Sequence, residues 1–216
     1  MEVKKIEEKF ILEYIRDTLK LFISKRDINM ADYFHHNSSY DSSPSIVKRG
    51  ILSLEEQNKK GINSYSEDVL KIMDDTTSHI NGSDGISLAR IGLRDLKENE
   101  EEYDPYNTWS VDFLIKQDIR AARVTRHYGN EYISFSSIKP SSFASVDVRF
   151  LKYVDKMTEN RHNIDYRDLV NRYNRLIMIA EEIIKRKLEI PFREMSYMPQ
   201  EIHVKKLANS PRLVLK

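Results

Sequence analysis

Apolar residues recur every three to four positions in two long stretches near the ends of the chain. This period predicts amphipathic helices, each with one face packed on the protein and the other in water. The first helix is expected over residues 3–25, and the second is expected to end at Pro191. The apolar positions of the first are Ile6, Phe10, Tyr14, Ile15, Leu19, Phe22 and Ile23. Those of the second are Leu169, Tyr173, Leu176, Ile177, Ala180, Ile183, Ile184 and Leu188.

Between these helices, short segments alternate apolar and polar residues, which predicts strands. The expected strands cover residues 31–36, 86–89, 109–115 and 131–138, and a last one runs through Val146, Val148 and Phe150. In the strand at 131–138, Ile133 and Phe135 are expected on one face.

Short helices are expected between the strands. The Asp41-Ser42-Ser43-Pro44 segment has polar capping residues followed by a proline, which is typical of a first helical turn, and Gly50 is expected to end that helix. Further helices are predicted at residues 54–60 and 67–79. Residues 195–216 show no clear period and are expected to pack as an irregular tail.

Strands clustered in the middle with helices at both ends predict an α+β fold with mixed or antiparallel sheets. We expect one compact domain in three parts. Residues 1–30 form a helix packed on the core, residues 31–155 form the α+β core, and residues 156–216 form a helical extension.

Composition narrows the function classes. The 216 residues carry a formal net charge of +1, which does not favour nucleic acid or an anionic membrane as a partner. No apolar run approaches the roughly 18 residues of a membrane helix, and the first ten residues are charged, unlike a signal peptide. We therefore expect a cytoplasmic protein, with leaderless export left open. Without cysteine or an i, i+4 histidine pair, no metal site is expected.

Three short blocks carry the candidate chemistry. The first is Phe34-His35-His36-Asn37-Ser38 followed by Ile46-Val47-Lys48-Arg49-Gly50-Ile51-Leu52, the second is Gly85-Ile86-Ser87-Leu88-Ala89, and the third is Tyr128-Gly129-Asn130-Glu131-Tyr132-Ile133. In this order and spacing they resemble the ADP-ribosyltransferase superfamily, over roughly residues 31–155. The resemblance implies a cleft between two small sheets that binds NAD.

The resemblance also implies roles for single residues. Cleavage of the nicotinamide–ribose bond passes through an oxocarbenium-like state that a carboxylate stabilises, and Glu131 matches that position. The implied cofactor-binding residues are His36 and Ser38 for a ribose, Tyr40 or Tyr65 for nicotinamide, and Arg49 with Lys48 for the pyrophosphate.

Three departures from the family pattern bear on this hypothesis. Asn37 stands where a small residue is usual, and the adjacent His35 and His36 leave the register open by one residue, which would exchange the two faces of the strand. Gly129 occupies the position two before Glu131 where a glutamate or glutamine often stands. Its presence points away from arginine modification, or towards no catalysis.

The leading hypothesis is a protein that transfers ADP-ribose to a macromolecular target or hydrolyses NAD, in the manner of toxins, effectors or phage-conflict proteins. One alternative is a non-catalytic module that binds a nucleotide-like ligand or a protein. The purely structural interpretation of the two site residues is that His36 caps a strand end or pairs with Asp32, and that Glu131 is a solvated edge residue. The other alternative is nucleic-acid binding through Arg120, Arg123, Arg126 and His127, which the net charge does not favour. Target, partner and oligomeric state stay open.

Overall fold

The protein is an α+β fold, as expected, and its main sheet is mixed. The expected cleft between two small sheets is not shown by the described residues. The computed structural model describes residues 2–24, 33–61, 86–91, 110–123, 131–159, 164–195 and 200–216. Within these ranges, nine strands form the sheet in the spatial order β2-β10-β9-β8-β5-β3-β4-β7-β6. Their bounds in that order are Ile23–Ser24, Gln200–Ile202, Phe192–Glu194, Phe143–Val148, Ser110–Ile115, Tyr33–Ser39, Ile86–Ile91, Glu131–Ser134 and Ala122–Arg123. Strands β8 and β9 are parallel, and the other neighbours are antiparallel.

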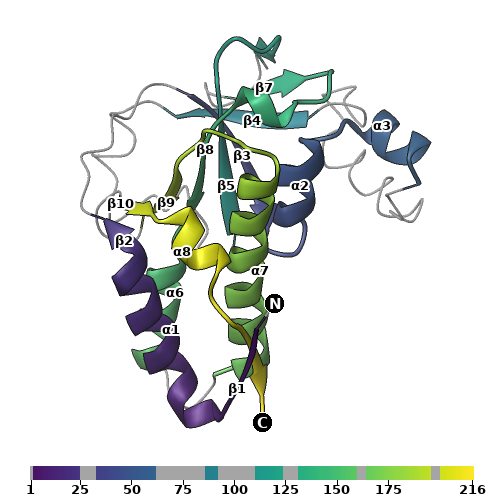
Figure 1. The fold of residues 1–216 in the computed structure, drawn as a ribbon. Helices are drawn as coiled ribbons and strands as arrows, with labels where there is room; N and C mark the ends of the chain where they lie inside the picture. The colour runs from purple at the N-terminus through teal and green to yellow at the C-terminus, as the bar shows by residue number, and fades with distance from the viewer. Residues whose placement is uncertain are drawn as a thin grey trace.

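Two further strands tie the ends of the chain together. Strand β1 (Val3–Ile6) and strand β11 (Arg212–Leu215) form a separate parallel pair, so both termini lie at the same end of the molecule (Figure 1). The described helices are α1 (Glu8–Phe22), α2 (Ser43–Arg49), α3 (Leu54–Lys59), α6 (Phe150–Glu159), α7 (Tyr166–Lys185) and α8 (Val204–Ala208), with the 3-10 turn η1 (Pro140–Ser142).

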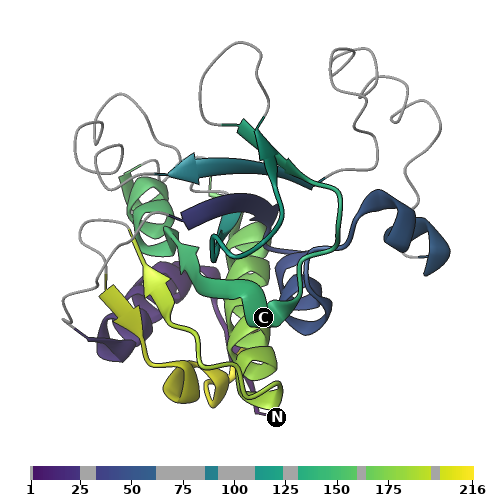
Figure 2. The same ribbon diagram turned by 90° about the horizontal axis from the view of Figure 1, so that it is seen from above.

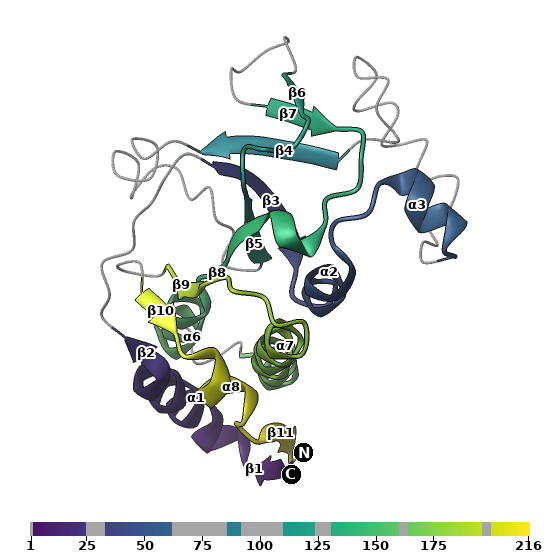
Figure 3. The same cartoon turned by 45° about the horizontal axis from the view of Figure 1, so that its top comes forward.

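The helices α1, α6, α7 and α8 lie together on one side of the sheet (Figure 3), whereas α3 lies at the margin of the molecule, away from α7 (Figures 1 and 2). The helix-facing side of the sheet is apolar. Its buried residues include Phe34, Val111, Phe113, Val146 and Val148, which join the α7 stripe in one hydrophobic cluster. Neighbouring residues of a strand point to opposite faces, so the residues between these belong to the other side.

Helix α7 is the central helix of this cluster, and six of the eight positions in its predicted stripe are buried within it. Of the other two, Ile184 is exposed and Leu188 lies beyond the end of the helix, whereas Val170 and Ile179 are buried without having been predicted. Asp165 caps its first turn by accepting hydrogen bonds from the backbone N–H groups of Arg167 and Asp168, both at 3.0 Å. The helix ends at Lys185, before Pro191. Lys187 takes a left-handed φ of 54°, and Leu188 donates its N–H to the Ile183 carbonyl, which is a Schellman ending.

Helix α6 is not predicted from the sequence, which assigns its first residue, Phe150, to the last strand. Phe150 begins α6 and does not continue β8. Its first turn is held by Glu194, a buried residue of β9 whose Oε2 accepts hydrogen bonds from the N–H groups of Phe150 and Leu151 at 3.1 and 3.2 Å. A carboxylate is favourable there because the first N–H groups of a helix lack partners within it. This cap comes from a residue 44 positions away, beyond the reach of a local pattern.

The expected helix over residues 3–25 is wrong at its start. Residues 3–6 form β1, because Ile6 is buried when that strand pairs with β11. Within α1 the buried residues are Ile11, Ile15 and Leu19, while Phe10 is 50% exposed. Tertiary pairing therefore overrides the apparent helical stripe at its first positions.

Two other expectations are corrected at the strands. Strand β7 ends at Ser134, and Phe135 is 62% exposed and does not share the buried environment of Ile133. Residues 200–215 contain β10, α8 and β11 and are not an irregular tail. These strands have three or four residues, too few for an alternation pattern, and they are fixed by pairing.

The expected elements at β3, α2, α3, β4 and β5 are present, including Pro44 in the first turn of α2 and Gly50 after its end. The expected end of β3 at residue 36 is wrong, because the strand continues to Ser39. The expected helix at 67–79 lies outside the described residues, as do Tyr65, Trp109, Arg126 and His127. No helix among the described residues combines the length and apolar character needed to cross a membrane.

Candidate functional site

The turn between β3 and α2 is held by a network of serine hydroxyls. Ser42 Oγ lies 2.8 Å from Ser38 Oγ and 2.7 Å from Ser39 Oγ, and Ser43 Oγ donates a hydrogen bond to the Ser39 carbonyl at 2.6 Å. The Ser38 hydroxyl is therefore engaged in the turn that begins the helix. Short polar side chains of this kind bond readily to nearby groups at turns and helix starts.

Two of the other residues assigned to cofactor binding, Tyr40 and Arg49, are described, and they differ in burial. Tyr40 is buried, with its ring 5.9 Å from that of Phe150. Arg49 is exposed in the last turn of α2, and Tyr65 lies outside the described residues. The backbone of Glu131 opens β7. Of the described side chains among these residues, Tyr40 lines the pocket described next and Arg49 does not.

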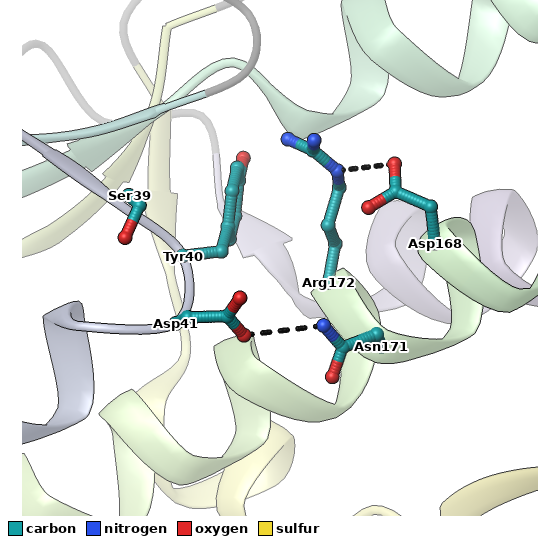
Figure 4. Close-up of a pocket in the computed structure, with 6 residues that line it drawn as sticks. All are labelled: Ser39, Tyr40, Asp41, Asp168, Asn171 and Arg172. Atoms are coloured by element: carbon teal, nitrogen blue, oxygen red, sulfur yellow. Dashed lines mark hydrogen bonds and ion pairs between the residues drawn. The ribbon is translucent and has the colours of Figure 1, made fainter.

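A small pocket lies beside the same turn (Figure 4). Its volume is about 70 Å³, and it is lined by Ser39, Tyr40, Asp41, Asp168, Asn171 and Arg172. Both carboxylates have partners. Asp41 accepts hydrogen bonds from Arg175 at 3.0 Å and Asn171 at 3.2 Å, whereas Asp168 accepts from Arg172 at 2.7 Å and Tyr153 at 2.6 Å.

The Arg172 guanidinium lies between the rings of Tyr40 and Tyr153, at 5.1 and 4.8 Å from their centroids. Burial raises the pKa of Tyr40 well above its ordinary value, and the nearby Glu194 carboxylate adds to this, so Tyr40 stays a neutral phenol. Pockets that bury a drug-sized ligand measure about 300–1,000 Å³, so this one has no room for a dinucleotide. The cation–π contacts and ion pairs of the residues that line the pocket join the β3–α2 turn to α7.

The two adjacent histidines lie on opposite faces of the sheet. His36 pairs across the strands with Phe113, a fully buried residue of the hydrophobic cluster, and therefore belongs to the helix-facing side. His35 lies on the other face, is 7% exposed, and its Nε2 is hydrogen-bonded to Asp112 Oδ1. The strand register thus fixes the one-residue ambiguity left by the sequence.

A row of polar residues crosses four strands on the same face as His35. Asn37, Asp112, Asp147 and Arg193 are successive cross-strand partners on β3, β5, β8 and β9. Asn37 Nδ2 donates to Asp112 Oδ1 at 2.9 Å. Arg193 donates to Asp147 twice, from Nε at 2.7 Å and from Nη2 at 2.5 Å. We call this surface, with His35, the polar face.

Four of the five residues of the polar face are buried, which makes their charges energetically important, whereas Asn37 is exposed. Asp112 is 1% exposed, and burial raises its pKa. The hydrogen bond and charge of His35 lower that pKa, the Asp147 charge raises it, and burial outweighs His35. The bidentate pair of Asp147 and Arg193 balances its own charge. Removing one member of such a pair costs about 3–5 kcal/mol, because it leaves the other charge buried without compensation.

A second row on the polar face leads to Glu131. His35 pairs with Ala89 of β4, and Ala89 pairs with Glu131 of β7. In the other direction, His35 pairs with Leu114, and Leu114 with Ser145. Tyr132, the neighbour of Glu131, packs its ring 5.0 Å from the core residue Phe34 on the helix-facing side. Strand alternation therefore assigns position 131 to the same face as His35.

Asp112, Asp147 and Arg193 are not among the functional candidates that the sequence indicates. A signal was present, since Val111-Asp112-Phe113 and Val146-Asp147-Val148 each place one acid between apolar residues of a predicted strand. That pattern more often marks a solvated sheet face. Only the register reveals that the two acids are neighbours and buried.

Among the described residues, no group of three or more histidine, cysteine, aspartate or glutamate side chains is placed to hold a metal ion. From the expected basic strip, only Arg120 has a described side chain, and it is exposed. Comparison with known proteins finds no match to a protein-family model, a curated protein or a solved structure.

Proposed function

We propose that the polar face binds NAD and that the protein is an ADP-ribosyltransferase-like enzyme. The observation that carries the proposal is the single cross-strand row of His35, Ala89 and Glu131 on three adjacent strands. Neighbouring strands lie about 4.8 Å apart, so positions 35 and 131 are separated by about 10 Å. The position between them in the row is Ala89.

In this proposal His35 takes the role that the sequence assigns to His36. The imidazole hydrogen-bonds a ribose hydroxyl, and Glu131 stabilises the positive charge that develops on the nicotinamide-bearing ribose. The bond between ribose C1′ and the nicotinamide nitrogen breaks, and its electron pair leaves with nicotinamide. A nucleophilic atom of the acceptor, or a water oxygen, then bonds to C1′ and loses its proton to the solvent.

The segment formed by β3, the following turn and α2 also supports the proposal. Strand β3 ends in a serine-held turn, α2 follows, and Gly50 ends that helix against the Ile138 carbonyl. This strand–turn–helix segment corresponds to the first of the three blocks that resemble the family. The described residues of the other two blocks, 86–89 and 131–133, belong to β4 and β7, which are neighbours in the sheet.

A second candidate function is a binding module without catalysis. Gly129 stands where an acid or amide would assist transfer, and His35 is already held by Asp112. Such a module would bind a nucleotide-like ligand on the same face and leave it intact.

The test is nicotinamide release from NAD by the purified protein, with cell lysate as a source of acceptors. Wild type is compared with Glu131→Gln, which keeps the size of the side chain and removes its charge. We expect release by wild type and a loss of at least about a hundredfold in the variant, the usual scale for removing a group that stabilises transition-state charge.

Glu189→Gln is the matched control, because Glu189 is exposed beyond the end of α7. It should release nicotinamide as wild type does. Equal release by wild type and Glu131→Gln would remove Glu131 from the mechanism. Stabilisation by NAD without release would favour the binding module, and no response to NAD at all would reject the proposed function.

A further inference from the structure

The side chain of Asp112 links the polar row to the row that contains Glu131. Its Oδ1 is hydrogen-bonded both to His35 Nε2 and to Asn37 Nδ2, the latter at 2.9 Å. His35 and Asp112 are 7% and 1% exposed, so water competes little with the contact between them. Hydrogen bonds that involve a charged partner are roughly twice as strong as neutral ones and more restrictive in geometry.

Among the charged groups of the polar face, Asp112 is coupled to His35 in particular. Asp147 is paired twice with Arg193, so that pair is balanced, and Asp147 otherwise repels Asp112. The group that opposes the desolvation of Asp112 most strongly is His35, through its hydrogen bond and its charge. The Asp112 carboxylate and the His35 imidazole are therefore coupled, and loss of the carboxylate removes the hydrogen bond that orients the ring.

From this geometry we propose that Asp112 is a positioning residue for NAD binding, which it promotes by orienting the His35 imidazole toward the ligand. The inference rests on the proposed function. Asp112 itself does not touch the ligand. Asn37 assists by donating to the same carboxylate oxygen, which keeps that oxygen facing His35. In this proposal the ligand-binding histidine is held in place by the row of Asn37, Asp112, Asp147 and Arg193.

The inference predicts that the substitutions change KM for NAD much more than kcat. Asp112→Asn should raise the KM for NAD about tenfold, the scale of losing one charge-assisted hydrogen bond, while kcat changes less than about threefold. His35→Gln should raise KM at least as much, because glutamine can still donate to Asp112 but cannot replace the imidazole. The double variant should have the KM of His35→Gln alone, because Asp112 acts only through His35.

The experiment measures nicotinamide release and NAD binding by calorimetry for wild type, both single variants and the double variant. Asp168→Asn is the matched control, since Asp168 also bonds an arginine and a tyrosine but belongs to α7. It should leave KM unchanged. If Asp112→Asn does not fold, Asn37→Ala replaces it, with an expected rise in KM of about threefold that disappears in the His35→Gln background.

The outcomes separate this inference from the proposed function. Wild type that neither releases nicotinamide nor binds NAD rejects the proposed function, and the inference with it. The inference alone is overturned if wild type responds to NAD but the effects of the two substitutions on KM multiply independently. It is also overturned if wild type responds to NAD and Asp112→Asn leaves the affinity for NAD unchanged.

Discussion

At the scale of single residues, the buried ionisable residues of the polar face affect how the stability of the protein depends on pH. Asp112 is the clearest case, because burial raises its pKa and His35 only partly opposes that effect. The folded protein therefore binds this proton more tightly than the unfolded chain does. A raised carboxyl pKa lowers stability as pH increases, and the decrease begins near the ordinary pKa of 3.8, where the unfolded chain loses the proton.

This sign predicts a pH-dependent difference between wild type and Asp112→Asn. The free energy of unfolding of wild type should fall relative to that of the variant as pH rises from about 4 through the raised pKa of Asp112, with a slope of at most about 1.4 kcal/mol per pH unit. Urea unfolding at a series of pH values measures the difference. Parallel curves, or a wild type that gains on the variant with pH, would show that burial does not dominate at Asp112.

A second prediction concerns the backbone at Gly50. Its φ of 88° and ψ of 180° fall in a region that only glycine adopts readily, and an added Cβ would meet the Ile138 carbonyl oxygen at 2.1 Å. Gly50→Ala should lower the free energy of unfolding by about 2 kcal/mol or more. Gly61→Ala is the control, because Gly61 has a φ of 61° and nothing within 4 Å. Its cost should be about 1 kcal/mol. Equal costs in denaturant unfolding would contradict the close packing at Gly50.

At the scale of elements, the best-predicted part of the fold is the longest. Helix α7 has twenty residues, so its apolar stripe repeats over several turns and Asp165 supplies a local cap. Short strands give no such signal. Strands β1 and β11 have four residues each, and their pairing joins positions about two hundred residues apart. A local pattern therefore reads residues 3–6 as the start of a helix.

The β1–β11 pair makes a prediction at this scale. Leu213 is 1% exposed, and Asn174 of α7 both donates to and accepts from its backbone at 2.9 Å. Leu213→Ala should lower the free energy of unfolding by about 2–4 kcal/mol. Val214→Ala, in the same strand, should change it by less than about 0.5 kcal/mol, because Val214 is 45% exposed. Similar effects of both changes in urea unfolding would mean that this segment is an irregular tail after all.

The candidate site was predicted only in part, and the reason lies in strand register. The sequence indicated β3, β4 and β7 and placed a histidine and Glu131 on them, but nothing local distinguishes His35 from His36. A shift of one residue exchanges the two faces of a strand. The partners Asp112, Asp147 and Arg193 come from three other strands, so their convergence depends on pairing that no single segment encodes.

At the scale of the whole molecule, we assign different roles to the two faces of the sheet. The helix-facing side is apolar and packs against α6 and α7, which stabilises the fold (Figure 3). The opposite side buries a network of charges that a purely structural sheet does not need, since replacing a buried ion pair by apolar residues is often neutral or stabilising. We interpret that network as the support of a ligand site, in which His35 and Glu131 share one row.

The central claim is therefore that NAD binds on the polar face and not on the helix-facing side, and the adjacent histidines test it most directly. NAD binding by calorimetry should be compared for wild type, His35→Gln and His36→Gln. The account predicts that His35→Gln weakens binding about tenfold or more, whereas His36→Gln binds as wild type does. Binding that is lost in His36→Gln and retained in His35→Gln would place the ligand on the other face and contradict the account.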